Sequence, residues 1–130
     1  MSDLRLGKRR IWRLFTICAL AAVSLAAIGP VQTASAAPSI HSIITDCTTA
    51  AGFGPLDVTT MKKIADYESH DHATSHSRSC WGLFQLSTSM VKGHPWSGPT
   101  WNTKRALKYI RSRYGAPRKA WAHIRKSGWY

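Results

Sequence analysis

The chain has 130 residues, and 18 Lys and Arg against six Asp and Glu give it a formal net charge of +12. This length excludes a multidomain architecture and leaves room for one modest core. No internal repeat or low-complexity tract is present, so we expect one compact unit. The charge favours an anionic partner, although solubility alone also accounts for a charge excess.

The first 36 residues have the pattern of a secretory signal peptide. A basic segment ends at Arg13, an apolar run of 16 residues covers 14–29, and Ala-Ser-Ala at 34–36 matches a cleavage signal. The apolar run is short for a membrane-spanning helix, which needs about 20 residues. We therefore predict that residues 1–36 are removed and that the protein is secreted. An uncleaved membrane anchor is the competing interpretation.

Cleavage would leave residues 37–130, a domain of 94 residues with a net charge of +8. Only two cysteines remain in it, Cys47 and Cys80, and an oxidising compartment favours their pairing. Closing such a loop is worth about 3–4 kcal/mol in the chain-entropy account. We predict a Cys47–Cys80 disulfide, with two free thiols or a metal-binding pair as the alternatives.

Helical periodicity dominates this domain. A first helix is predicted after Pro38-Ser39, and the Gly-Phe-Gly-Pro turn at 52–55 ends it. The i, i+3, i+4, i+7 face of this helix consists of Ile40, Ile43, Ile44 and Cys47.

The second predicted helix, capped by Asp57 or Thr59, carries the only glutamate of the chain. Glu68 occupies the fourth position of a stripe with the same spacing, after three apolar residues. A carboxyl at the edge of an apolar stripe is partly desolvated, which raises its pKa. A raised pKa suits a general acid that works near neutral pH. An ordinary helix residue is the alternative interpretation. The apolar residues of this stripe are Met61, Ile64 and Ala65.

The remaining segments predict two more long helices and few strands, so we expect a mainly α fold. A polar loop follows Ser69, and the apolar segment 80–86 reads as a short extended or turn segment. Later elements are a short helix over 87–91, a loop over 92–99, a helix from Thr100 or Asn102 to Gly115, and a last helix from Pro117.

Three motifs in this order resemble a known family. They are Glu68-Ser69, the Gly-Leu-Phe-Gln segment at 82–85, and an ending with Ala-Trp-Ala-His at 120–123 and Gly-Trp-Tyr at 128–130. Together they resemble the lysozyme-like lytic transglycosylase domains of small secreted actinobacterial cell-wall proteins. The resemblance covers about residues 57–130 and implies a single compact lysozyme-like domain.

The resemblance also implies roles for individual residues. Glu68 would match the catalytic acid, and Ser69 would match the neighbour that orients it. Gly82 and Gln85 would match the segment that forms the opposite wall of the sugar cleft, which Tyr109 would also line. The sequence departs from the family in its histidine-rich loop and at His123, where the wider family has Asn. The loop histidines are His70, His72 and His76.

Glu68 has no obvious partner carboxyl. A glycosidase normally uses two, about 5–5.5 Å apart for retention or about 6.5–9.5 Å apart for inversion. Asp66 lies two residues before Glu68, so it points to another face of the helix. Asp71 in the loop is the one acid that could approach. A lytic transglycosylase needs one carboxyl, because in the family mechanism the 6-hydroxyl of muramic acid attacks the anomeric carbon.

Aromatic side chains fit a glycan site, because flat rings stack on sugar faces. Trp81 and Trp96 stand in loop contexts near Gln85 and are the sugar-stacking candidates. Trp121 lies on an apolar helix face and is a core residue by its pattern. The loop histidines have ligand types that suit zinc, but a solvated loop that titrates near pH 6.5 is the favoured interpretation, and no metal or cofactor is predicted.

These observations lead to one expectation and two rivals. We expect a secreted monomer that cleaves the β-1,4 bond between N-acetylmuramic acid and N-acetylglucosamine in peptidoglycan. The rivals are a two-carboxylate muramidase and a non-catalytic cationic protein that binds the cell wall. Anionic wall polymers are further candidate partners. Nucleic acid is not expected, since no nucleic-acid-binding motif is present, and no membrane span is expected after cleavage.

Overall fold

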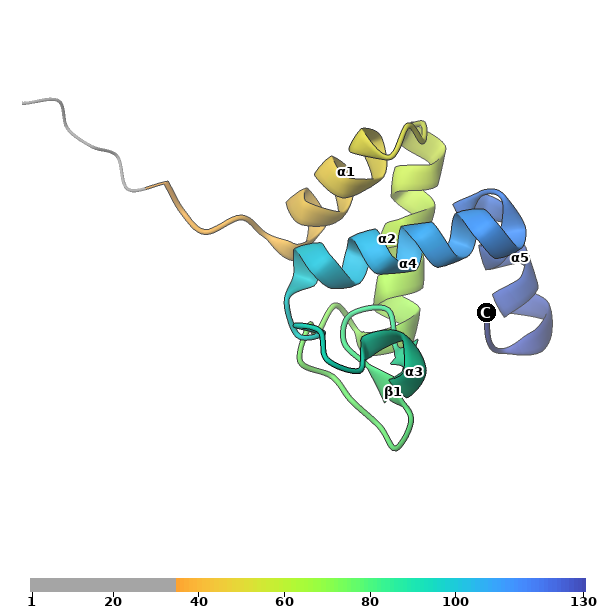
Figure 1. The fold of residues 1–130 in the computed structure, drawn as a ribbon. Helices are drawn as coiled ribbons and strands as arrows, with labels where there is room; N and C mark the ends of the chain where they lie inside the picture. Colours follow the sequence, from red (N-terminus) through yellow and green to blue (C-terminus); the bar gives the residue numbers. More distant parts are fainter. Residues whose placement is uncertain (1–34) are drawn as a thin grey trace, which may run out of the picture. The chain divides into compact units, whose positions relative to one another are not determined.

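Most of the described chain is helical, with one antiparallel two-stranded sheet. The computed structural model describes residues 35–130, and the predicted signal peptide lies almost wholly outside them. The prediction of a mainly α fold is confirmed, and no helix of the described part is long and apolar enough to cross a membrane. In chain order the elements are α1 (Ile40–Ala50), α2 (Pro55–Ser69), β1 (Cys80–Trp81), β2 (Leu86–Ser87), α3 (Thr88–Val91), α4 (Pro99–Tyr114) and α5 (Pro117–Ser127) (Figure 1).

The long helices enclose one core. Helix α1 packs against α2 and α4, and α5 packs against the same two helices (Figure 1). All three apolar residues of the predicted α2 stripe are buried, which confirms that face of the helix. Burying one large apolar side chain contributes about 1.5–3 kcal/mol. The largest fully buried apolar side chains are Phe84, Ile44, Met61, Ile64, Leu83, Ile110 and Ile124.

Three helices begin with a proline at their first position. Proline fits there because the N–H that it lacks has no intrahelical partner at that position. Pro55 and Pro99 therefore start α2 and α4, earlier than the predicted capping residues, while the predicted start at Pro117 is confirmed. Asp57 is buried inside α2 and accepts a hydrogen bond from Arg118 Nε of α5 at 3.0 Å. It joins two helices instead of capping one.

The predicted disulfide is wrong, because Cys47 and Cys80 are both free thiols. Cys47 is buried in α1 and lines a cavity with Lys104 and Leu107 of α4. Cys80 in β1 lines a different cavity, with Tyr109 of α4. The two sulfurs therefore lie against different faces of the same helix, out of reach of a covalent bond. Packing and hydrogen bonds stabilise this domain in place of the covalent link.

Candidate active site

Glu68 lies in the last turn of α2 with its side chain half-buried. Within residues 35–130 its carboxyl takes part in no ion pair, and burial raises its pKa from 4.5 to about 7. The negative end of the α2 dipole lies at the same place and acts in the same direction. A carboxyl with this pKa exists in both forms at neutral pH, so it can give a proton and later take one.

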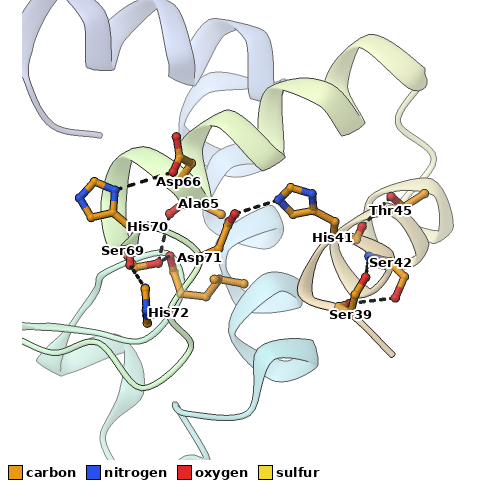
Figure 2. Close-up of polar contacts among 11 residues, drawn as sticks. Ser39, His41, Ser42, Thr45, Ala65, Asp66, Ser69, His70, Asp71 and His72 are labelled. Carbon is orange, nitrogen blue, oxygen red and sulfur yellow. Dashed lines mark hydrogen bonds and ion pairs between the residues drawn. The ribbon is translucent and has the colours of Figure 1, made fainter. Parts of the chain in front are cut away.

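The neighbouring Ser69 is buried and joins α2 to the hairpin. Its hydroxyl donates to the carbonyl oxygen of Leu83 at 2.8 Å and lies 3.1 Å from the carbonyl oxygen of Ala65 (Figure 2). The Ser69 hydroxyl has a single proton to donate to these two carbonyl oxygens. The shorter contact, to Leu83, is the one that joins α2 to the hairpin. Ser69 therefore fixes the end of α2, and with it Glu68, against the hairpin segment 82–85. By the resemblance, this segment would form the wall of the sugar cleft opposite Glu68.

The chain reverses sharply after Ser69. His70 and Asp71 have φ angles of 50° and 60°, a conformation that side chains rarely adopt. The reversal directs the Asp71 carboxylate to α1, where its Oδ2 lies 2.8 Å from His41 Nε2 (Figure 2). Burial is the cause of the raised pKa of Glu68, and neither Asp71 nor the exposed Asp66 contributes to the shift.

Gly82 opens the hairpin loop between β1 and β2, and this position requires glycine. Its φ is +79°, and a Cβ there would lie 2.1 Å from Asn102 Nδ2 and 2.7 Å from the carbonyl oxygen of Trp96. Leu83 and Phe84 follow at the tip of the hairpin and are fully buried. The predicted turn over this segment is therefore present, and its tip forms part of the core.

Asn102, which the sequence offered only as a possible start of its helix, is a structural residue inside α4. It is fully buried in α4, and its Oδ1 accepts the Phe84 N–H at 2.9 Å. Its Nδ2 donates to the carbonyl oxygens of Trp81 at 3.2 Å and Trp96 at 3.0 Å. The available signal was its position four residues before Ala106, on the predicted inward face of the helix.

Tyr130, the last residue of the sequence, was also missed. Its hydroxyl donates a hydrogen bond to the carbonyl oxygen of Phe84. Burial raises the pKa of Tyr130 well above its usual value, and the charge of Glu68 is the next cause, which places the two side chains near each other. The hairpin tip thus accepts hydrogen bonds from Ser69 and Tyr130 and donates one to Asn102, and two of these three residues lie near Glu68.

A cavity of about 190 Å³ opens beside Tyr130, and it is lined by Gln85 and Tyr109 among others. Tyr109 contacts Tyr130 edge-on, with 5.9 Å between ring centroids. The amide of Gln85 donates to the carbonyl oxygens of Gly82 at 2.8 Å and Ser75 at 3.2 Å. The structure therefore brings Gln85 and Tyr109 together, and Gln85 also holds the loop in place.

The predicted sugar-stacking residues Trp81 and Trp96 pack against each other, with ring centroids 5.1 Å apart. His76 stacks on Trp81 at 5.4 Å, so one face of that indole is already covered. Both tryptophans line a separate hollow of about 360 Å³ with Thr88 and His94. Neither lines the cavity at Tyr130. Trp121 is half-buried and meets Tyr67 edge-on at 5.8 Å.

The loop histidines do not converge. His70 Nδ1 lies 3.7 Å from Asp66 Oδ1, His72 Nδ1 lies 3.1 Å from the carbonyl oxygen of Ser69, and His76 stacks on Trp81. Among residues 35–130 no three His, Cys, Asp or Glu side chains form a metal-binding group. His123 packs between Trp129 at 4.7 Å and Tyr114 at 5.4 Å, and its Nε2 is buried without a hydrogen-bond partner among the described residues.

Comparisons with protein-family models, with curated proteins and with solved structures found no match to this chain. The geometry around Glu68 is therefore the basis for a functional assignment.

Proposed function

We propose that this protein is a secreted lytic transglycosylase that cleaves the β-1,4 bond between N-acetylmuramic acid and N-acetylglucosamine. One observation carries the proposal: Glu68 is half-buried, has no ion-pair partner among the described residues, and has a pKa of about 7. A structural carboxyl at such a position is normally paired or exposed. A carboxyl that works as acid and base needs this intermediate pKa.

The chemistry assigns two proton transfers to Glu68. In its protonated form it gives the proton to the glycosidic oxygen as the bond to the anomeric carbon breaks. The 6-hydroxyl of the same muramic acid residue then bonds to the anomeric carbon, and the Glu68 carboxylate takes the hydroxyl proton. The products are an anhydromuramic acid end and a free 4-hydroxyl, and Glu68 is again protonated.

Within residues 35–130 the two acids nearest to Glu68 in sequence, Asp66 and Asp71, are paired with histidines, which favours this route over a two-carboxylate muramidase. Asp71 was the candidate for a second carboxylate, and it is engaged by His41 on α1. Asp66 is exposed and paired with His70. A hydrolase that uses one carboxyl would need water to be positioned by other groups, whereas a transglycosylase uses a nucleophile that belongs to the substrate.

The second candidate function is a non-catalytic protein that adheres to an anionic cell wall. The +8 charge of residues 37–130 favours it, because a basic surface binds acidic polymers whether or not a catalytic residue is present. This candidate gives no role to the raised pKa of Glu68, and for that reason we place it second.

The test is release of soluble fragments from purified peptidoglycan sacculi, with their ends identified by mass spectrometry. We expect anhydromuramic ends from the unmodified protein and no release from Glu68→Gln. Asp66→Asn, which removes an exposed carboxyl two residues away in the same helix, should keep its activity. Reducing ends would instead indicate a hydrolase. Undiminished release by Glu68→Gln would exclude this residue as the acid.

A further inference from the structure

A hollow between α3 and α4 adjoins the candidate active site. The 190 Å³ cavity beside Tyr130 shares its lining residues Ser87, Met90 and Tyr109 with a second cavity of about 370 Å³. We call the second cavity the α3–α4 hollow, after the two helices that supply most of its lining residues. A group that occupies this hollow would lie directly beside the cavity that Tyr130 lines.

Two cationic side chains line the α3–α4 hollow, Arg105 and Lys108 of α4. Neither takes part in an ion pair within residues 35–130, where three of the five acids are paired with other residues. The Nε of Arg105 is shielded from solvent and has no hydrogen-bond acceptor among the described residues. A shielded donor without an acceptor is costly, and a bound anion would satisfy it.

Hydroxyl groups complete the lining. The hydroxyl oxygens of Ser87 and Ser89 lie 3.1 Å apart, so one proton joins them and the other is free to donate. Ser87 precedes α3, but its side chain makes no capping hydrogen bond. The lining of the hollow therefore includes a guanidinium, an ammonium and a hydroxyl donor, and no Asp or Glu lines it. This donor set matches a carboxylate or a phosphate.

We propose that the α3–α4 hollow binds a carboxylate of the peptide stem carried by the muramic acid residue at the cleavage site. This inference rests on the proposed function. The stem peptide is attached to the sugar that reacts, so its carboxylates are covalently tethered to the glycan that the neighbouring cavity would hold. A phosphate polymer joined through the 6-hydroxyl would block the nucleophile of the proposed reaction. The peptide carboxylate is therefore the anion that fits both the hollow and the chemistry.

Binding is measured in the Glu68→Gln background, so that no turnover occurs. The probe is a GlcNAc–MurNAc tetrapeptide with free carboxyl groups, and its fully amidated counterpart is the comparison ligand. By calorimetry we expect Arg105→Gln and Lys108→Gln each to weaken binding of the free-acid probe about tenfold, since each removes a charge-assisted contact. Neither should change binding of the amidated probe. Lys119→Gln, an exposed residue of α5, is the control with the same change of charge.

Three results would overturn this inference. The first is equal binding of the two probes, and the second is an equal loss of affinity with Lys119→Gln. The third is that Arg105→Gln and Lys108→Gln weaken binding of a soluble glycerol phosphate polymer but not of the free-acid probe. Lys108 is exposed, so its variant tests the hollow even if the Arg105 variant unfolds. If the unmodified protein releases fragments from sacculi but the two probes bind equally, only the assignment of the hollow is wrong. No binding and no release would defeat the proposed function as well.

Discussion

The Ser69 hydroxyl donates to the Leu83 carbonyl oxygen at 2.8 Å, and this bond joins the end of α2 to a hairpin tip buried in the core. Glu68 stands next to this bond, at a helix end that would fray without it. Through Phe84 the same tip also accepts a hydrogen bond from the Tyr130 hydroxyl and donates one to Asn102 Oδ1. The candidate acid is therefore placed by a rigid support that reaches it from three separate parts of the chain.

Replacing Ser69 by Ala should lower both stability and activity. The change leaves the buried carbonyl oxygen of Leu83 without a donor, which costs about 1–3 kcal/mol. It also frees the end of α2, so the rate of fragment release should fall more than the affinity for glycan. Denaturant unfolding and steady-state kinetics measure the two effects.

Thr59→Ala is the matched control for that experiment. The Thr59 hydroxyl donates to the Pro55 carbonyl oxygen at 3.1 Å in the same helix, but the residue is exposed. Its loss should change stability by about 0.5 kcal/mol or less. Equal effects from the two substitutions would show that the contact between Ser69 and the hairpin does not matter.

Gly82→Ala should be among the most destabilising single changes in the domain. A methyl group there meets Asn102 Nδ2 at 2.1 Å and the Trp96 carbonyl oxygen at 2.7 Å, and the φ of +79° adds backbone strain. Strain and overpacking together predict a loss of about 3 kcal/mol. Gly93→Ala separates the two terms, because its φ is +77° but nothing lies within 4 Å of the added carbon. It should cost about 1 kcal/mol.

Local patterns in the sequence were enough to predict the helix face that carries Glu68, but only part of its support. The apolar stripe on α2 follows from helical spacing, and the turn at Gly82 follows from a glycine within an apolar run, so both were predicted. Asn102 and Tyr130 were not, because their roles depend on the hairpin tip, which lies far from both in sequence. No local pattern indicates which distant carbonyl a buried amide or hydroxyl will meet.

The disulfide prediction failed for a related reason. Counting cysteines in a domain that is predicted to be exported identifies which thiols are available, but pairing requires two Cα atoms within about 7 Å. The first helix carries Cys47 to the side of α4 that holds Lys104, while β1 carries Cys80 to the side that holds Tyr109. A prediction from the number of cysteines contains no information on chain topology, and the topology places these two thiols on different sides of α4.

The free thiols should differ in reactivity. Cys47 is 7% exposed and burial raises its pKa, so little thiolate forms and reagents reach it slowly. Cys80 is half-buried at the edge of a cavity and should react with iodoacetamide at least about tenfold faster. Mass spectrometry of partially alkylated protein gives both rates, and in guanidinium chloride the rates should become equal. A reductant should leave Tm unchanged, and a lower Tm in its presence would indicate a disulfide.

The raised pKa of Glu68 predicts how activity and stability depend on pH. Since the protonated carboxyl starts the reaction, the rate of fragment release should decline above about pH 7, tenfold per unit once the acid form is scarce. In the folded state the carboxyl holds its proton up to about pH 7, whereas in the unfolded chain it loses it near 4.5. The contribution of this proton to stability is therefore complete below pH 4.5 and is lost as pH rises through 7.

Glu68→Gln removes this titration and tests the assignment without any substrate. Thermal unfolding of the unmodified protein and of the variant should show a Tm difference that shifts in favour of the variant between pH 4.5 and 7. Asp66→Asn, at an exposed position in the same helix, should show no such shift over that range. Parallel Tm curves for Glu68→Gln and the unmodified protein would mean that Glu68 titrates as an ordinary surface carboxyl, and its role as the acid would then lose its physical basis.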